Sequence, residues 1–183
     1  MPGEVGDIVI VDYDPRWPAM FADERTRLLR AIGDDVVGIE HVGSTAIHGL
    51  GAKPIIDILV GVRRIEEAGA LILPLEGLGY EYVPEYESEI PDRRYFRKGP
   101  AGGRTLHLHT VAFGGEFWTR HLLFRDFLRA HPEVARRYDV LKRDLAVRFR
   151  GDRDAYAKAK TAFVQRVEAR ARVGSDSDRQ GEA

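Results

Sequence analysis

Residues 39–62 constrain the fold more than any other stretch, because two apolar runs flank a turn rich in glycine and hydroxyl residues. The second run, 55–62, is so apolar that its single carboxylate, Asp57, stands out. An ionised side chain in such a run is costly unless a metal ion or several hydrogen-bond donors compensate it. The turn Gly43-Ser44-Thr45 offers open backbone N–H groups of the kind that hold phosphate. The stretch therefore predicts a strand–turn–strand unit with a phosphate-and-metal site.

The length of 183 residues favours one compact domain, which we place at residues 1–172. Residues 173–183 are almost entirely polar and are expected to form a disordered tail. The absence of cysteine excludes disulfides, thiolate nucleophiles and cysteine metal sites. The N-terminus lacks the pattern of a secretory signal, and no segment is long and apolar enough to cross a bilayer, so we expect a cytoplasmic protein.

Charge is distributed unevenly along the chain although the net charge is only −1. Residues 1–90 carry a balance of −10, and residues 91–172 carry a balance of +11. The basic half indicates either a polyanion-binding surface or solvated helix faces, and the sequence leaves both open. A nucleic-acid partner is not expected, because the chain has no recognisable helix-turn-helix, zinc module or aromatic stacking face.

Hydrophobic periodicity predicts an α+β (mixed α/β) fold in which helices pack on a mixed β-sheet and the C-terminal part is helical. Strands are expected at 36–42, 55–62, 80–83, 94–97 and 105–113, with a hairpin turn, KGPAGG, between the last two. A short edge strand is also expected at 8–11. Helices are expected from a cap at Asp14 and a first position at Pro15 to about Gly33, at 65–75, and at 116–130, 132–149 and 152–171.

The strand 105–113 places two histidines on one face, because side chains alternate along a strand. His107 and His109 share that face, whereas Leu106 and Leu108 point away. The imidazoles suit metal binding, proton transfer or donation to phosphate, and the alternative is a structural pair. Asp57 has a structural alternative too, as a carboxylate that accepts hydrogen bonds from turn amides. For the pair placed opposite Asp57 we favour a functional role.

Basic residues near these strands are candidates for neutralising phosphate. Lys53 precedes Pro54 at the start of the Asp57 strand, and Arg94 and Lys98 lie in the following basic strand. Glu40, on the strand before the turn, is a candidate second carboxylate for a metal ion.

Four segments resemble the GrpB family: HVGSTAIHGLGAKPIIDILVGV, RTLHLHTV, RHLLFRDFLRAHPEVARRYDVLKRDLA and AYAKAKTAFV. They occur in the family's order over roughly residues 12–171. The family is similar to the nucleotidyltransferase superfamily that includes polymerase beta, and some members are fused to dephospho-CoA kinase. That pattern implies a phosphate-binding Gly43-Ser44 pair and a first metal-binding acid at Asp57. The chain departs from it with Leu59 at the second-acid position and a histidine where the third acid would project.

The resemblance implies an Mg²⁺-assisted nucleotidyltransferase that moves a nucleoside monophosphate from an NTP to a small-molecule acceptor. In that interpretation the roles are phosphate binding by Gly43, Ser44, Thr45, Lys53, Arg94 and Lys98, metal binding by Asp57 and Glu40, and deprotonation of the acceptor by His107 or His109. The missing second acid favours the alternative, a non-catalytic nucleotide- or coenzyme-binding accessory domain that acts through a protein partner.

Overall fold

A computed structural model describes residues 7–100 and 103–180, with side chains as far as Val173. The helices are α1 (Trp17–Ile32), α2 (Ile72–Gly77), α3 (Glu116–Ala130), α4 (Pro132–Phe149) and α5 (Arg153–Gln180). The strands are β1 (Gly38–Val42), β2 (Ile56–Val62), β3 (Glu81–Tyr82), β4 (Arg93–Lys98) and β5 (Leu106–Ala112). Short 3₁₀ helices are η1 (Gly33–Asp35), η2 (Ser44–Ala46), η3 (Ile65–Leu71) and η4 (Pro84–Glu87).

The five strands form one mixed sheet in the order β1-β2-β5-β4-β3. Strands β2 and β5 run parallel in the centre, and the other neighbouring pairs are antiparallel. The parallel register places Asp57 beside His107 and Leu59 beside His109. The predicted α+β fold, with a mixed sheet and a helical C-terminal part, is confirmed.

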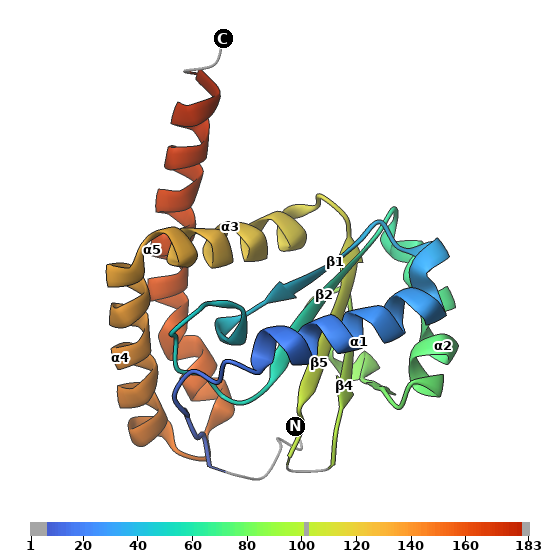
Figure 1. The fold of residues 1–183 in the computed structure, drawn as a ribbon, viewed down its shortest axis with the longest axis horizontal. Helices are drawn as coiled ribbons and strands as arrows, with labels where there is room; N and C mark the ends of the chain where they lie inside the picture. Colours follow the sequence, from blue (N-terminus) through green and yellow to red (C-terminus); the bar gives the residue numbers. More distant parts are fainter. Residues whose placement is uncertain (1–6, 101–102, 181–183) are drawn as a thin grey trace.

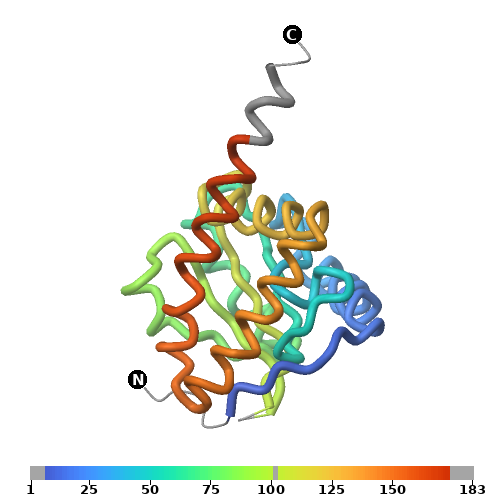
Figure 2. The backbone as a smooth tube through the Cα atoms, turned by 90° about the vertical axis from the view of Figure 1, so that its left-hand side faces the viewer, coloured from blue at the N-terminus to red at the C-terminus, as the bar shows by residue number. Residues whose placement is uncertain are grey.

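Each face of the sheet has its own helical cover (Figure 1). Helices α1 and α2 pack on the face of Ile56, Ile58 and Val60, where the largest hydrophobic cluster forms. The other face carries Asp57 and Leu59. There α3 covers one end, with Trp118 packed on Leu59, and the α4–α5 pair stands beside the other (Figure 2). No helix within the described residues is both long and apolar enough to span a membrane.

Four segments differ from the expected elements. Val11 forms an isolated bridge with Ala52 where an edge strand was expected at 8–11. Helix α1 begins at Trp17, because Asp14 and Pro15 form a turn ahead of it that is closed by a hydrogen bond from the Trp17 N–H to the Asp14 carbonyl.

Residues 65–75 form the 3₁₀ helix η3 followed by the short α2, because Gly69 and Pro74 disfavour one continuous α-helix. Helix α5 extends to Gln180, whereas we expected disorder from residue 173. Residues 101–102 of the expected hairpin turn and 181–183 of the expected tail lie outside the described residues, although β4 and β5 do pair as a hairpin.

Candidate functional site

A cavity of about 530 Å³ lies between the Asp57 face of the sheet and the inner sides of α4 and α5. The sheet contributes Asp57, His107 and His109 to its lining, and the helices contribute Lys142, Tyr156 and Lys160. Asp57 and the two histidines are therefore brought together, as the strand periodicity predicted. Figure 2 looks onto the two helices from outside, with the sheet behind them.

Asp57 lies between the two histidines. Its Oδ1 is 3.4 Å from Nδ1 of His107 and 4.0 Å from Nε2 of His109. Burial opposes ionisation of Asp57, but hydrogen bonding and charge interactions with the histidines outweigh it and lower its pKa. Burial also lowers the pKa of His109, against the opposing effect of Asp57. The result is an ionised carboxylate beside a His109 imidazole that is neutral near pH 7.

Both histidines keep a second nitrogen that is buried and accepts or donates no hydrogen bond within the described residues. These atoms are Nε2 of His107 and Nδ1 of His109, and Nε of Arg93 is in the same condition. All three residues line the cavity. Because buried polar groups are normally paired, this end of the cavity is suited to a polar ligand.

Gly43 is required at the turn that borders the cavity. Its φ of +72° is the left-handed conformation that favours glycine, and a Cβ there would overlap Oδ2 of Asp57. The sequence prediction of a special turn at Gly43 is consistent with this geometry. Ser44 also lines the cavity, and its Oγ accepts a hydrogen bond of 3.1 Å from Nζ of Lys142.

Thr45 has a structural role that the sequence did not indicate. Its buried hydroxyl donates to the carbonyl of Ile55, at 3.3 Å, and so can only accept from Nε2 of His41, at 2.9 Å. This side chain therefore ties the turn to β1 and to the start of β2. Thr45 itself lines the cavity, and its expected phosphate contact through the backbone N–H groups of the turn stays a prediction.

Two of the expected phosphate-binding cations are on the wrong face of the sheet. In β4, Tyr95 pairs with His109 and shares its face, whereas Arg94 and Lys98 alternate to the opposite face with Phe96. Arg94 forms an ion pair with Glu87 at 3.4 Å, and Nζ of Lys98 lies 2.8 Å from Glu24. Neither lines the cavity, so their predicted phosphate role is wrong.

The cations that do line the cavity are Lys53, which was predicted, and Arg93, Lys142 and Lys160, which were not. The guanidinium of Arg93 lies 5.2 Å from the ring centroid of Tyr95. Lys142 is 2% exposed, although it belongs to a basic helix. Its spacing of four residues from buried Tyr138 was the one sequence signal that it lies on the apolar side of α4.

Glu40 shares the Asp57 face but does not line the cavity. It pairs with Leu59 in the sheet, under the part covered by α3, and its Oε2 accepts a 2.6 Å hydrogen bond from Arg125. His121 of α3 also lines the cavity, although no strand periodicity or motif in the sequence singled it out. Its Nδ1 donates to the Phe117 carbonyl at 2.7 Å, so Nε2 is the acceptor nitrogen.

The donor set does not fit the two-magnesium clamp that the nucleotidyltransferase pattern implies. Asp57 is the one carboxylate in the cavity lining, and Leu59, at the second-acid position, is fully buried against Trp118. Mg²⁺ prefers oxygen ligands, and the remaining neighbours are imidazoles. Among the described residues, no group of three His, Cys, Asp or Glu side chains is arranged to hold a metal ion.

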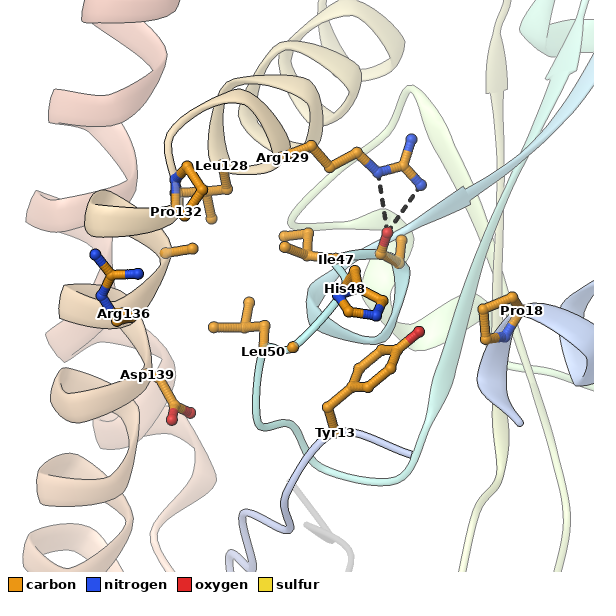
Figure 3. A pocket seen from close by; sticks show the side chains of 13 residues that line it. Tyr13, Pro18, Ile47, His48, Leu50, Leu128, Arg129, Pro132, Arg136 and Asp139 are labelled. Carbon is orange, nitrogen blue, oxygen red and sulfur yellow. Dashed lines mark hydrogen bonds between the residues drawn. The ribbon is translucent and has the colours of Figure 1, made fainter. Parts of the chain in front are cut away.

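A second cavity, of about 590 Å³, lies on the other side of residues 46–50 (Figure 3). Arg129 holds this segment through two hydrogen bonds, of 3.0 and 2.8 Å, to the carbonyl of Ala46. His48 lies here beside Tyr13, with the ring centroids 4.9 Å apart. None of the Asp57, His107 and His109 group lines this cavity, so it is separate from the candidate site.

The comparison with known families gives a match over residues 7–170 to the model described as GrpB protein. The chain belongs to the GrpB family. The resemblance noted in the sequence is therefore confirmed, and the match includes every residue that lines the cavity.

Similar GrpB proteins include a UPF0157 protein of Pseudomonas aeruginosa, which is 44% identical over 90% of this chain and 67% of its own length. The UPF0157 protein YqkA of Bacillus subtilis is 39% identical over 90% of this chain, which spans about half (47%) of YqkA. A crystal structure of the conserved protein GrpB from Enterococcus faecalis superimposes with a TM-score of 0.79 at 39% identity, covering 89% of this chain and 96% of that one. A dephospho-CoA kinase of Mycolicibacterium paratuberculosis is 31% identical over 92% of this chain and 47% of its own length.

Proposed function

We propose that this GrpB chain binds the phosphates of a nucleotide or nucleotide-derived coenzyme in the cavity of Asp57. The observation that carries the proposal is the charge of the lining: four cationic side chains, Lys53, Arg93, Lys142 and Lys160, face one carboxylate. Such an excess of cations within a concave site favours a ligand with several negative charges.

The similarity to dephospho-CoA kinases supports a nucleotide-derived ligand. This chain matches about half of such a kinase, so the GrpB part is one portion of a longer protein whose name refers to a coenzyme precursor. The presence of a GrpB part and a dephospho-CoA kinase name in one protein favours a GrpB domain that holds the phosphates of a nucleotide-like coenzyme.

The decisive experiment uses two neighbouring arginines on opposite faces of β4. Arg93→Gln removes a cation from the cavity, and Arg94→Gln removes one from the far face. We expect isothermal titration calorimetry with ATP and with coenzyme A to show about tenfold or greater loss of affinity for Arg93→Gln only, the scale of one charge-assisted hydrogen bond. Equal losses in both variants, or no binding of either ligand to the wild type, would contradict the proposal.

Nucleotidyl transfer is the second candidate function. It is favoured by the position of His109 in the cavity lining, where burial lowers its pKa and its Nε2 lies 4.0 Å from the Asp57 carboxylate. In this proposal an acceptor hydroxyl attacks the α-phosphorus of an NTP, the P–O bond to pyrophosphate breaks, and a histidine takes the hydroxyl proton. Because Asp57 is the carboxylate in the lining, we propose one Mg²⁺ ion rather than two. Asp57 and the phosphates of the ligand would hold this ion.

Pyrophosphate release separates catalysis from binding. We expect the wild type, incubated with Mg²⁺, mixed NTPs and a metabolite extract, to release pyrophosphate, and Asp57→Asn to release none while keeping its fold by circular dichroism. Release by Asp57→Asn at the wild-type rate would remove Asp57 from the reaction. If the wild type binds a nucleotide but releases no pyrophosphate, nucleotidyl transfer is excluded and the non-catalytic accessory domain remains as the proposal.

A further inference from the structure

We infer that the three lysines that line the cavity, Lys142 of α4, Lys160 of α5 and Lys53 just before β2, select ligands with at least two linked phosphates. We also infer that these lysines take up protons as the ligand binds. This inference rests on the proposed function, because it assumes that phosphates enter the cavity. It names the part of the site that holds them, which is the helical side rather than the Gly43-Ser44 turn alone.

The three ammonium groups occupy one side of the cavity. Lys160 lies over the ring of Tyr156, with Nζ 4.2 Å from the centroid, and Lys53 lies 5.8 Å from the same centroid. Lys142 is deeper, where its Nζ donates to Oγ of Ser44 and to the carbonyl of Gly51. Neither Lys142 nor Lys160 forms an ion pair with a carboxylate in the described part of the chain.

The groups around Lys142 disfavour its charged form. Burial is the main cause, the charges of Lys160 and Arg143 add to it, and Asp139 opposes them, so that the pKa of Lys142 is lowered to about 7. Its other polar contacts, Ser44 and Gly51, are neutral.

Lys160 has a similar environment at the other end of the lysine group. Burial and the charge of Lys53 lower its pKa to about 8, although Asp57 opposes the change. Lys142 and Lys160 therefore lack the anion that would hold both of them protonated at pH 8.

A polyphosphate supplies that anion. One phosphate carries about 1.5 to 2 negative charges, whereas the cavity lining holds four cationic side chains and one carboxylate. A ligand with two or three linked phosphates matches this excess, and the cavity of about 530 Å³ has room for it. Because the bound anion raises the pKa of each lysine, the complex holds more protons than the free protein between about pH 7 and 9.

The test uses inorganic tripolyphosphate and orthophosphate as probes of the full chain. Calorimetry at pH 8 in Tris and in HEPES, which differ in ionisation enthalpy, measures the protons taken up on binding. We expect proton uptake with tripolyphosphate, at least tenfold weaker binding of orthophosphate, and a loss of tripolyphosphate affinity of at least about tenfold between pH 7 and 9.

Two lysine variants are compared with a control, Lys158, on the helix that carries Lys160. Lys160→Gln and Lys142→Met are each expected to lower tripolyphosphate affinity about tenfold and to reduce the proton uptake. Lys158→Gln should match the wild type, because Lys158 is exposed and does not line the cavity. Lys160→Gln keeps the test valid if Lys142→Met does not fold.

The outcomes separate this inference from the proposed function. Tripolyphosphate binding that Arg93→Gln weakens but Lys160→Gln does not would overturn the lysine site and leave phosphate binding in place. Orthophosphate binding as tight as tripolyphosphate, or binding without proton uptake, would overturn it too. If tripolyphosphate, ATP and coenzyme A all fail to bind the wild type, both proposals are wrong.

Discussion

Two charged clusters lie on opposite faces of the same sheet, and they differ in how completely they are paired. On the α1 side, Glu24 accepts hydrogen bonds from the hydroxyl of Tyr80, at 2.9 Å, and from Nζ of Lys98, at 2.8 Å. Burial and the Glu24 carboxylate raise the pKa of Tyr80, so this hydroxyl remains a donor. On the α4–α5 side, Asp57 faces four cations across a cavity, and Lys142 has only neutral hydrogen-bond partners.

This difference in pairing indicates which charged groups stabilise the fold and which are available to a ligand. Glu24 is almost completely buried, yet its neighbours satisfy it, so we assign it to stability. The cavity cluster contains more cations than anions and three buried nitrogens without partners in the described chain, which is the pattern expected of the proposed binding site. Mutation should therefore affect the two clusters in opposite ways.

The largest effect is expected at the paired cluster. Glu24→Ala leaves the buried Tyr80 hydroxyl without an acceptor and Lys98 without its carboxylate, so unfolding in urea should show a loss of about 3–5 kcal/mol. The affinity for tripolyphosphate should be unchanged. Asp23→Ala, on the exposed neighbour, is the control and should cost no more than about 0.5 kcal/mol. A loss of binding without a loss of stability in Glu24→Ala would reverse our assignment of the clusters.

Acid stability compares one histidine from each face. Burial lowers the pKa of both His41, in β1 and stacked on Phe21 of α1, and His121, at the cavity, to about 4. The unfolded chain therefore binds more protons between about pH 6.5 and 4, and stability should fall as the pH falls through that range, by about 2–3 kcal/mol per histidine. His121→Gln should remove its share of this slope, and His48→Gln, on an exposed site, should not.

Bound phosphate sharpens that comparison. Tripolyphosphate should reduce the acid loss due to His121, because the anion favours the imidazolium, and leave the loss due to His41 intact. Thermal unfolding between pH 4 and 7, with and without tripolyphosphate, measures both. An equal effect of the ligand on His121→Gln and His41→Gln would contradict the placement of the anion.

A smaller effect of opposite sign is expected at the cavity cluster. Lys142→Met replaces a buried ammonium by an apolar chain of similar length, and we expect about 2 kcal/mol of added stability at pH 7. In the wild type the lowered pKa of Lys142 means that stability should rise with pH between about 7 and 10.5, and the variant should lose this rise. Denaturation at pH 7 and 9 tests both points, and destabilisation by Lys142→Met would identify the lysine as a structural residue.

Strand periodicity was sufficient to predict the centre of the candidate site. Side chains alternate along a strand, so His107 and His109 must share a face whatever their neighbours are. The apolar run around Asp57 is typical of a central strand, which is where the structure places this residue. The sequence does not show which face of β4 lies on the same side of the sheet as Asp57, His107 and His109. The strand sequence RRYFRK has basic residues at both odd and even positions, so alternation gives no preference. The burial of Phe96 against the α1 side decides the phase, which is why Arg93 reaches the cavity and Arg94 does not.

The helical side of the site depends on tertiary packing. The helices α3 and α4, and the start of α5, were predicted to within one residue from their caps and apolar spacing, whereas α5 ends nine residues later than expected. Which basic residues they turn inward is set by how α4 and α5 pack together and by where they lie on the sheet. The sequence therefore did not distinguish Lys142 and Lys160 from the other basic residues of the C-terminal half. It also predicted Glu40 as a metal ligand, because the hydrogen bond from Arg125 of α3 to Glu40 depends on tertiary packing.

The parallel pairing of β2 with β5 has a consequence for how the site comes into being. Asp57 and His107 are 50 positions apart in the chain, and they become neighbours only when two central strands separated by a helix and two other strands have docked. Such a long-range closure is among the slower events of folding. The candidate site is thus a late product of chain assembly, and a nascent chain released before β5 has left the ribosome would contain Asp57 without its histidine partners.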